Sequence, residues 1–323
     1  MSLYTGIDVS KLTFDCSISL ADGSVRELKT GNNSDGFQKL LKNLPSDSHV
    51  VMEASGPYYL RLAYFLHAQG IPVSVVNPLV IKRFCQMRMV RTKTDKKDAS
   101  MIRQYGQSEQ PELWEPDSPD ITRLKQLNSA IELLDKNITA SHNQLEAFKT
   151  MPDTDKSLIK SLEAVIKQNE NAKERLEKEM LLLAKKKFNK SYMALQTIPG
   201  IGPKSAALLV AITSNFSKFN HYKELVAYVG LNPRIYESGT SVKGRGHISK
   251  MGTGKMRKLL YLCSWSAKRC NVHCKEMYER LKAKSKPERV IKVAIANKLL
   301  RQAFAIGKYG TEFKANYQNQ FAF

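Results

Sequence analysis

A long apolar stripe in the middle of the chain restricts the fold more than any other feature of the sequence. Apolar residues recur every three or four positions from residue 124 to 148 and, after Met151-Pro152-Asp153, again from 159 to 183. They are Leu124, Leu127, Ile131, Leu134, Ile138, Leu145 and Phe148, followed by Ile159, Leu162, Ile166, Leu176, Met180 and Leu183. This heptad pattern predicts a coiled-coil helical hairpin over residues 119–187. Because so long a stripe needs a partner surface, the hairpin is either an intramolecular spacer or an arm for oligomerisation.

The residues before the hairpin alternate between strand and helix patterns. Strands are expected over 3–9, 12–20, 25–30, 49–53 and 71–76, and helices over 34–44, 57–69, 79–87 and 94–107. Three strands in succession, followed by alternating helices and strands, predict a mixed sheet that is covered by helices. Ribonuclease-H-like nucleases and integrases have this order of elements. We therefore expect an α/β domain of the RNase H-like (RuvC-like) class over residues 1–112.

The residues after the hairpin, 188–323, predict a mostly α-helical domain. The segment Ile198-Pro199-Gly200-Ile201-Gly202-Pro203-Lys204 fits the helix-hairpin-helix pattern. In that pattern glycines let backbone amides approach a phosphate at a helix N-terminus. An ordinary glycine turn between two packed helices fits the same residues. A polar loop over 232–241 and basic helices from residue 248 onward are expected to follow.

Positive charge is concentrated in two parts of the chain. The sequence has 51 Lys and Arg against 30 Asp and Glu, a formal net charge of +21. Residues 241–301 contain 17 basic and 3 acidic residues, and residues 81–103 contain 8 and 2. A surface adapted only for solubility would mix the two signs, whereas concentrated positive charge is typical of nucleic-acid binding. An anionic membrane surface fits less well, because no Trp- or Phe-rich amphipathic segment accompanies the charge.

The sequence also indicates a compartment. No apolar run approaches 18 residues, so a membrane span is excluded, and the N-terminus lacks the features of a secretory signal. Five cysteines, an odd number, favour a reducing cytoplasm over a disulfide framework. Cys263, Cys270, His273 and Cys274 are close in the sequence, but structural zinc sites usually draw their ligands from two separated knuckles. We therefore expect partly buried thiols in a cytoplasmic protein.

Four acidic residues form the candidate catalytic site. Asp8 and Glu53 end apolar strands, and Asp95 and Asp98 lie three residues apart near the start of a helix, on one face of it. A carboxylate at the end of an apolar strand is costly unless it is paired or used. Carboxylates that converge from strand ends and a helix predict a site for Mg²⁺ or Mn²⁺, and two such ions stabilise phosphodiester cleavage. The alternative is that Asp95 caps its helix, Asp98 is a surface charge and Asp8 forms a salt bridge.

These motifs resemble those of the DEDD transposases of the insertion-sequence 110 family and the related Piv-type DNA invertases. Gly-Ile-Asp-Val-Ser-Lys from Gly6, Met-Glu-Ala-Ser-Gly from Met52 and Lys-Thr-Asp-Lys-Lys-Asp-Ala from Lys93 match the three blocks of the family's RuvC-like domain. Residues 230–239, 248–250 and 257 look like its second domain. The resemblance implies a DNA transposase or site-specific recombinase that cleaves and rejoins DNA. It also implies that the metal-binding tetrad falls on Asp8, Glu53, Asp95 and Asp98.

The resemblance further implies a nucleophilic serine in the second domain. It maps best to Ser238, and Ser241 is a second candidate three positions later. Nearby Lys243, Arg245 and His247 either bind the reacting phosphate or make nonspecific contacts with the nucleic-acid backbone. The basic residues that we expect at nucleic acid are Lys204, Lys243, Arg245, Lys250, Lys255 and Arg257.

The family's partners follow from the same resemblance. They are DNA and a structured noncoding guide RNA from the element itself, which pairs with target and donor DNA. A homo-oligomer, a dimer or tetramer, is implied, in which the metal domain of one subunit meets the serine domain of another. A nucleoid-associated protein of a bacterium or archaeon, without a membrane partner, is expected.

Two other functions fit the residues. One is a RuvC-like nuclease or junction resolvase that cuts DNA without forming a phosphoserine bond, and trapping a covalent adduct would separate it from a recombinase. The other is a noncatalytic nucleic-acid-binding protein that uses the basic helices. Four clustered carboxylates speak against a pure binder, because negative charge opposes contact with phosphates.

Overall fold

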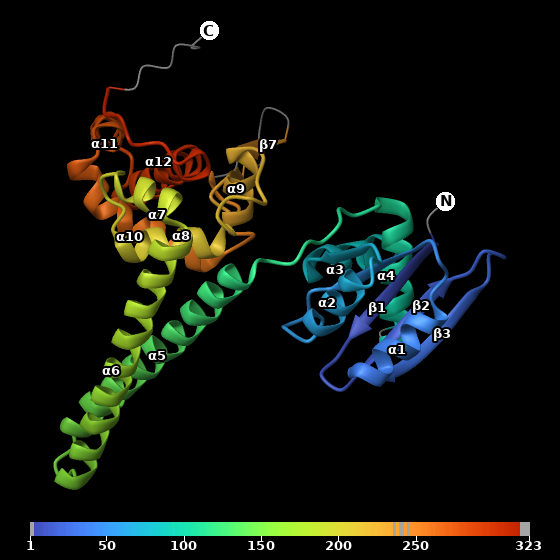
Figure 1. Cartoon of the computed structure of the whole chain (residues 1–323). Coiled ribbons are helices and arrows are strands. Elements are labelled where there is room, and N and C mark those ends of the chain that lie inside the picture. The colour runs from blue at the N-terminus through green and yellow to red at the C-terminus, as the bar shows by residue number, and fades with distance from the viewer. Residues whose placement is uncertain (1–2, 93, 235–236, 239–241, 244–245, 317–323) are drawn as a thin grey trace. The chain divides into compact units, whose positions relative to one another are not determined.

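The computed structural model describes residues 3–92, 94–234, 237–238, 242–243 and 246–316, with the backbone alone at 237–238 and 242–243. The chain divides into two compact units, Met1–Pro116 and Asp117–Phe323 (Figure 1). Each unit has its own hydrophobic core.

The first unit is built on a mixed five-stranded sheet in the order β3-β2-β1-β4-β5. The strands are β1 (Leu3–Val9), β2 (Thr13–Ser19), β3 (Val25–Gly31), β4 (Ser48–Glu53) and β5 (Val73–Val76). The helices are α1 (Ser34–Asn43), α2 (Leu60–Ala68), α3 (Pro78–Met87) and α4 (Asp95–Glu109). Strand β1 pairs antiparallel with β2 and parallel with β4, while β3 is antiparallel to β2 and β5 parallel to β4. The predicted order of elements and the mixed sheet are confirmed.

Alternating side chains give the sheet two covered faces. Ile7 of β1 is fully buried in a cluster that includes Leu40 of α1 and Leu62 of α2. Val51 of β4 packs in a second cluster with residues of α3 and with Ile102 of α4. Successive residues of a strand point to opposite faces. Helices α1 and α2 therefore cover one face of the sheet, and α3 and α4 cover the other.

Helix α4 lies very close to β1 because each carries a glycine at the contact. A Cβ atom on Gly6 would lie 2.2 Å from the carbonyl oxygen of Ala99 and from the amide nitrogen of Arg103, which are backbone atoms of α4. A Cβ atom on Gly106 would lie 2.8 Å from the ring of Tyr4. Residue numbers rise along α4 as they fall along β1. The start of α4 therefore lies beside the end of β1.

The second unit begins with two long helices, α5 (Pro119–Lys149) and α6 (Lys156–Lys187), which form an antiparallel hairpin (Figure 1). Ion pairs join them along its length: Asp120–Lys187, Arg123–Glu179, Asp135–Lys173 and Lys149–Glu163. Stripe residues at the base of the hairpin, such as Leu124 and Met180, are buried in the core of the unit. The predicted helical hairpin is present. Its coiled-coil geometry and its part in oligomerisation stay predictions.

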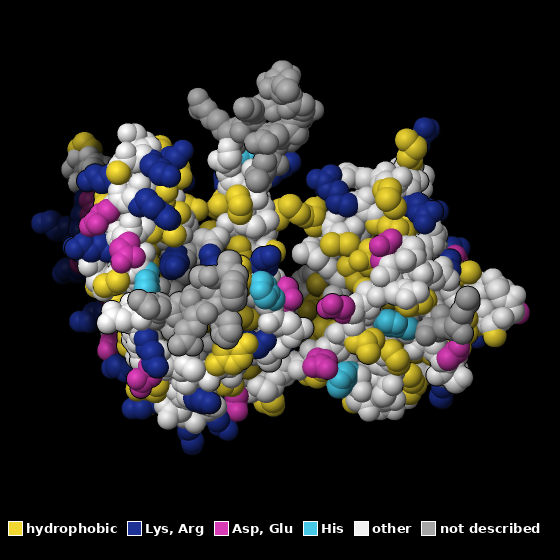
Figure 2. All heavy atoms as spheres, turned by 90° about the horizontal axis from the view of Figure 1, so that it is seen from above, with side chains coloured by type: hydrophobic (Ala, Val, Ile, Leu, Met, Phe, Trp, Pro, Cys, Tyr) yellow, Lys and Arg dark blue, Asp and Glu magenta, His cyan; other side chains and the backbone are white. Residues whose placement is uncertain are grey.

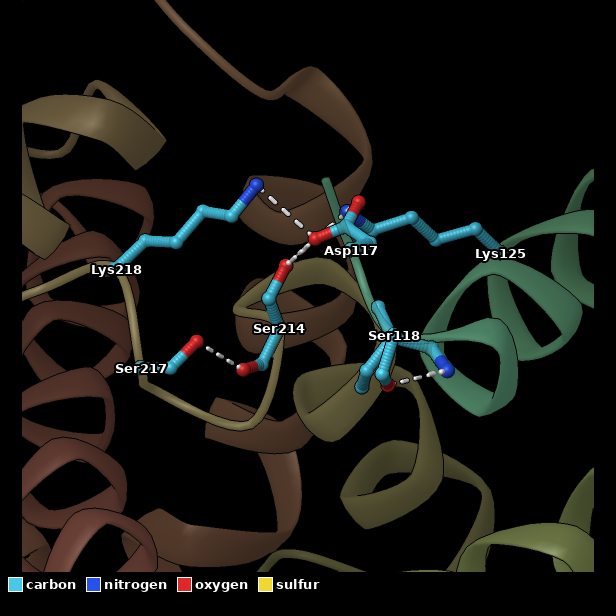
Figure 3. A network of polar contacts seen from close by, with 7 residues as sticks. Asp117, Ser118, Lys125, Ser214, Ser217 and Lys218 are labelled. Carbon is cyan, nitrogen blue, oxygen red and sulfur yellow. Dashed lines mark hydrogen bonds and ion pairs between the residues drawn. The ribbon is translucent and has the colours of Figure 1, made fainter. Parts of the chain in front are cut away.

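A polar network fixes the start of α5 (Figure 3). The carboxylate of Asp117 accepts a hydrogen bond from the Ser214 hydroxyl at 2.7 Å and forms ion pairs with Lys125 at 2.6 Å and Lys218 at 3.0 Å. Burial opposes ionisation of Asp117, but these bonds outweigh it and hold its pKa below the usual range. Ser118 caps α5 through its hydroxyl oxygen. The first residues of the unit are thereby tied to the turn that follows α8.

The rest of the second unit is largely helical. Its helices are α7 (Asn189–Gln196), α8 (Pro203–Ile212), α9 (Tyr222–Val229), α10 (Gly254–Cys270), α11 (Val272–Ala283) and α12 (Glu288–Tyr309). Ile295 and Leu299 of α12 are fully buried with Leu195 of α7 and Leu260 of α10. The predicted helical C-terminal region is confirmed. Among the described residues, no helix is both long and apolar enough for a membrane span.

The glycine turn between α7 and α8 was expected to fit a helix-hairpin-helix. Gly200 has φ of +104°, and a Cβ atom there would lie 2.7 Å from the Cβ atom of Ala267 in α10. Glycine is needed at this position because of both its backbone conformation and this contact. Gly202 is the N-cap of α8 and faces open space. The two helices and the turn are present, while phosphate binding there stays a prediction.

The polar loop expected over 232–241 contains short strands instead. β6 (Pro233–Arg234) pairs with β9 (His247–Ile248), and β7 (Glu237–Ser238) pairs with β8 (Val242–Lys243), both antiparallel. We call the β6–β9 pair the ribbon. Strands of two residues are too short to show the alternation by which a strand is recognised in a sequence.

Two of the three clustered cysteines are buried. Cys263 and Cys274 lie in the core of the second unit, while Cys270 is exposed. Burial raises the pKa of the Cys274 thiol to about 12. This thiol is therefore protonated at neutral pH and packs as a small apolar side chain.

Candidate active site

Asp8 and Glu53 lie side by side at the ends of two neighbouring strands. The parallel ladder of β1 and β4 runs through the pair Ile7–Met52, and Asp8 and Glu53 are the next residue on each strand. Neighbouring strands are about 4.8 Å apart. Both side chains belong to the face covered by α4, since Ile7 points to the opposite face. The ladder register therefore places two carboxylates next to each other under α4.

Asp95 and Asp98 occupy the first turn of α4. The helix cap is Thr94, whose hydroxyl oxygen accepts a hydrogen bond from the Lys97 amide at 3.2 Å. The alternative interpretation of Asp95 as the cap is therefore wrong. Because the start of α4 lies beside the end of β1, these two carboxylates face the site of Asp8. The N-terminus of a helix also favours negative charge.

The charges of the other three carboxylates of the predicted tetrad act on Asp8. Burial, and then the negative charges of Asp98, Glu53 and Asp95, raise the pKa of Asp8 from 3.8 to about 6. Among the described residues, no lysine, arginine or histidine forms an ion pair with Asp8. The salt bridge that was the alternative role of Asp8 is thus not found there. Within the described part of the chain, this half-buried carboxylate is therefore surrounded by like charge and is not paired with a cation.

A fifth carboxylate belongs to the same face and was not singled out from the sequence. Asp15 of β2 is the direct ladder partner of Asp8. It differs from Asp8 because Lys29 of β3 forms an ion pair with it at 3.0 Å. The Lys29 ammonium also lies 3.8 Å from the Asp95 carboxylate. The alternation Thr13-Phe14-Asp15-Cys16 could have indicated the face of Asp15, but not its partner.

The donor set fits a divalent cation in its chemistry. Carboxylate oxygens are the ligands that Mg²⁺ prefers, and a cation would relieve the repulsion at Asp8. The side chains do not form a finished coordination cage: within the described part of the chain, no three His, Cys, Asp or Glu residues are arranged to hold a metal ion. Glu53 instead accepts a hydrogen bond from the Ser55 hydroxyl.

The predicted nucleophile belongs to the second unit. Ser238 is in β7, where its ladder partner is Val242 of β8. Lys243 is in β8, opposite Glu237. The side chains of these residues, together with Ser241 and Arg245, lie outside the described residues. The described ribbon shows where this segment begins and ends, at Arg234 and His247.

The other predicted nucleic-acid residues have different surroundings. Lys204 pairs with Glu177 at 2.6 Å, and Lys255 pairs with Glu132 at 2.5 Å. Arg257 donates hydrogen bonds to backbone carbonyls, whereas Lys250 is exposed. Lysine and arginine side chains recur across the face of the second unit that is visible in Figure 2. Two of the predicted contacts are thus already paired with acids of the hairpin helices.

Comparison with known proteins identifies the family. A transposase model of the DEDD type from the insertion-sequence 110 group matches residues 5–150, and a model described as "Transposase IS116/IS110/IS902 family" matches residues 192–279. The pilin gene-inverting proteins of Moraxella bovis and Moraxella lacunata are each 28% identical over 319 residues, which is 96% of this chain and 97% of theirs. The transposase for insertion sequence element IS1328 of Yersinia enterocolitica is 32% identical over 122 residues, 37% of this chain and 36% of the relative. The chain belongs to the insertion-sequence 110 family of transposases.

Proposed function

We propose that this transposase-family protein cleaves and rejoins DNA with a divalent-metal site on its first unit and a serine nucleophile on its second. The observation that carries the proposal is the position of Asp8 beside Glu53 at the ends of two paired strands, where burial and four neighbouring carboxylates raise the pKa of Asp8 to about 6. Structural carboxylates normally have cationic or hydrogen-bonding partners. A half-buried carboxylate whose pKa is raised by neighbouring carboxylates, as that of Asp8 is, is typical of a site that works with a bound cation.

Asp8, Glu53, Asp95 and Asp98 are the residues that would hold the ions, Mg²⁺ or Mn²⁺. When bound, such ions supply charge stabilisation for the attacking and leaving oxygens of phosphodiester cleavage. The protein's own contribution is to hold the four carboxylates together against their repulsion. The β1–β4 ladder fixes the first two, and the contact of α4 at Gly6 brings the other pair to them. The strand order β3-β2-β1-β4-β5 supports an RNase H-like (RuvC-like) class for this unit.

Ser238 is the proposed nucleophile, and Ser241 is the second candidate. A serine hydroxyl is a weak nucleophile, so it needs charge stabilisation of the phosphate that it attacks. Lys243 and Arg245 of the same segment are proposed to supply positive charge. A site on a short segment between ribbon strands can reach a phosphate that is held elsewhere.

The proposed partners are DNA, a structured noncoding guide RNA and further copies of the chain in a dimer or tetramer. The DNA is supported by family membership and by the net charge of +21. The full-length relatives are named for inverting a pilin gene, and the shorter match is named as a transposase. Both names describe recombination, so the present proposal is a recombinase of either kind. The competing function is a nuclease or junction resolvase without a covalent step.

Covalent trapping tests the serine directly. Trypsin cleaves after Arg234 and Lys243, so both candidate serines fall in one peptide of residues 235–243. We expect denatured reactions with Mg²⁺ and recombination-site DNA to contain this peptide bound to DNA. Tandem mass spectrometry then locates the attachment, which we expect at Ser238. Ser238→Ala should remove the adduct and strand exchange while binding persists, and Ser241→Ala is the matched control.

Two outcomes would change the assignment. An adduct at Ser241 would keep the mechanism but move the nucleophile. If no adduct forms in any trapped reaction and both alanine variants recombine normally, the enzyme uses neither Ser238 nor Ser241 as a nucleophile. Cleavage that still depends on Asp8 would then support the metal-dependent nuclease.

A further inference from the structure

A basic pocket in the second unit is lined by two of the residues predicted to contact nucleic acid and by three other polar residues. The cavity has a volume of about 500 Å³, and its polar lining consists of Lys250, Arg257, Lys258, Tyr261 and Arg289. Among the residues whose side chains are described, no aspartate or glutamate lines it. In the described part of the chain, none of the four cations forms an ion pair with a carboxylate. The pocket therefore concentrates positive charge that the described residues leave uncompensated.

Arg257 is held in place before any ligand arrives. Its Nη1 atom donates hydrogen bonds to the carbonyl oxygen of Val229 at 2.7 Å and to that of Gly252 at 3.2 Å. Carbonyl oxygens orient the guanidinium but do not neutralise its charge, and they use only one of its three nitrogens. A cation fixed in this way loses little side-chain freedom when it binds an anion. The geometry suits a ligand with oxygens of fixed position, such as a phosphate.

The remaining lining has the properties of a nucleotide site. Lys258 of α10 and Arg289 of α12 are exposed at the pocket, and Val293 and Ala296 of α12 provide an apolar wall. Tyr261 adds an aromatic ring beside the cations. Cations that hold a phosphate next to a ring on which a base can stack are the usual elements of single-strand binding. The volume lies in the range of small-ligand sites, roughly 300–1,000 Å³, which suits one nucleotide of a strand.

We propose that this pocket binds one nucleotide of a DNA strand, with the phosphate against Arg257, Lys258 and Arg289 and the base against Tyr261. The choice of DNA rests on the proposed function. The pocket is connected to the serine segment through the ribbon, because Ile248 of its lining pairs with Pro233 of β6. Ser238 follows Pro233 by five residues in the chain. A strand held in the pocket is thus held at the base of the segment that carries the proposed nucleophile.

A charge-matched pair of double variants tests the pocket. Lys258→Ala with Arg289→Ala removes two exposed pocket cations, so the core is not disturbed. Arg269→Ala with Lys275→Ala removes two exposed cations of α10 and α11 that do not line the pocket. Binding of the full chain to labelled single-stranded DNA is measured by fluorescence anisotropy between 50 and 200 mM salt. All proteins carry Ser238→Ala and are kept in EDTA, so the result does not depend on any reaction.

We expect the pocket pair to weaken binding about 10- to 100-fold and to reduce the salt slope by about 1.4, the value for two phosphate contacts on a single strand. The control pair should change affinity less than about 3-fold. Tyr261→Ala should weaken binding about 10-fold, whereas Tyr261→Phe, which keeps the ring, should not.

Equal losses in the two double variants would overturn the proposal, because they would show a general effect of charge. A loss confined to RNA of the same sequence would overturn the assignment to DNA. If the serine and carboxylate variants recombine normally while the pocket pair still weakens DNA binding selectively, only the proposed chemistry is wrong.

Discussion

Replacing Asp8 by asparagine should make the first unit more stable when no metal is present. The pKa of Asp8 is about 6 in the folded protein against 3.8 without the fold, so ionisation is opposed by about two pKa units. Two units correspond to about 3 kcal/mol. Asp8 is half-buried, and solvent screening reduces the expected gain to about 2 kcal/mol. Asparagine keeps the size of the side chain and removes the charge that its neighbours repel.

The sign of the pH dependence follows from the same shift. A carboxyl group whose pKa is raised by folding binds more protons in the folded state, so its ionisation costs stability as the pH rises. The cost is absent below about pH 3.8 and complete above about pH 6. We therefore expect Asp8→Asn and wild type to have similar stability at about pH 3.5. The difference should grow between pH 4 and 6 and stay constant at neutral pH.

The two tryptophans allow each unit to be followed separately in the full chain. Trp114 belongs to the first unit and Trp265 to the second, so a Trp265→Phe background leaves Trp114 as the reporter of the first unit. Urea unfolding in EDTA then gives its free energy of unfolding. Asp15→Asn is the matched control: Asp15 is the ladder partner of Asp8 but is paired with Lys29, so its replacement should stabilise the unit less than Asp8→Asn does.

Added Mg²⁺ should make the wild-type first unit more stable than the Asp8→Asn unit, which reverses the order expected without metal. Wild type should gain stability with the ion, by about 2.7 kcal/mol at a hundred times its dissociation constant, and Asp8→Asn should gain less. Recombination by the variant should fall at least about a hundredfold. A less stable Asp8→Asn unit at neutral pH in EDTA, or a difference that does not change with pH, would refute the reasoning from charge repulsion.

The other predictions concern packing, assembly and a surface network. Gly6→Ala forces a Cβ atom against backbone of α4 and should destabilise the first unit by about 2–3 kcal/mol, whereas Gly106→Ala meets side chains rather than backbone and should cost about 1 kcal/mol, as measured by urea unfolding. Replacing residues 139–171 by a short flexible linker removes the tip of the hairpin but keeps its buried base, so the second unit should stay folded. Light scattering should then show a smaller assembly. An unchanged mass would mean that the hairpin is a spacer. Hydrogen bonds from Lys268 and other groups lower the pKa of Glu288 from 4.5 to about 2. Glu288→Gln should therefore remove the part of the second unit's stability that is lost at acid pH, and Trp265 fluorescence measures this unfolding. That contribution is present above about pH 4.5 and is lost as the pH falls towards 2.

The sequence allowed the elements of the first unit to be predicted because each carries a clear period. Alternation gave the strands, and 3–4 spacing gave the helices that cover them. Asp8 and Glu53 were singled out because an acid at the end of an apolar strand is rare without a use, and the role of the four carboxylates as metal ligands stays a prediction. The helix predicted to start at residue 94 starts at Asp95, one residue later. These features depend on near neighbours in the chain, which a sequence displays directly.

Features that depend on register or on contact between distant residues could not be predicted. Asp15 reads as an ordinary outward-facing residue of an alternating strand, and only the β1–β2 ladder makes it the partner of Asp8. The contact of Gly6 with α4 joins residues that are more than ninety positions apart. In the second unit, the pairing of Lys204 with Glu177 likewise depends on how the hairpin packs against α8.

The arrangement of the carboxylates explains why the neighbouring negative charges raise the pKa of Asp8. Asp95 is largely exposed and belongs to the first turn of a helix, where the backbone amides favour negative charge. Asp15 has its own lysine. Asp8 has neither among the described residues, and it is flanked by Glu53 on one strand and by Asp15 on the other. The close contact at Gly6 then adds the charges of α4 from above the sheet. A cation bound among these groups would therefore act mainly by relieving Asp8, which is the residue whose replacement should show it.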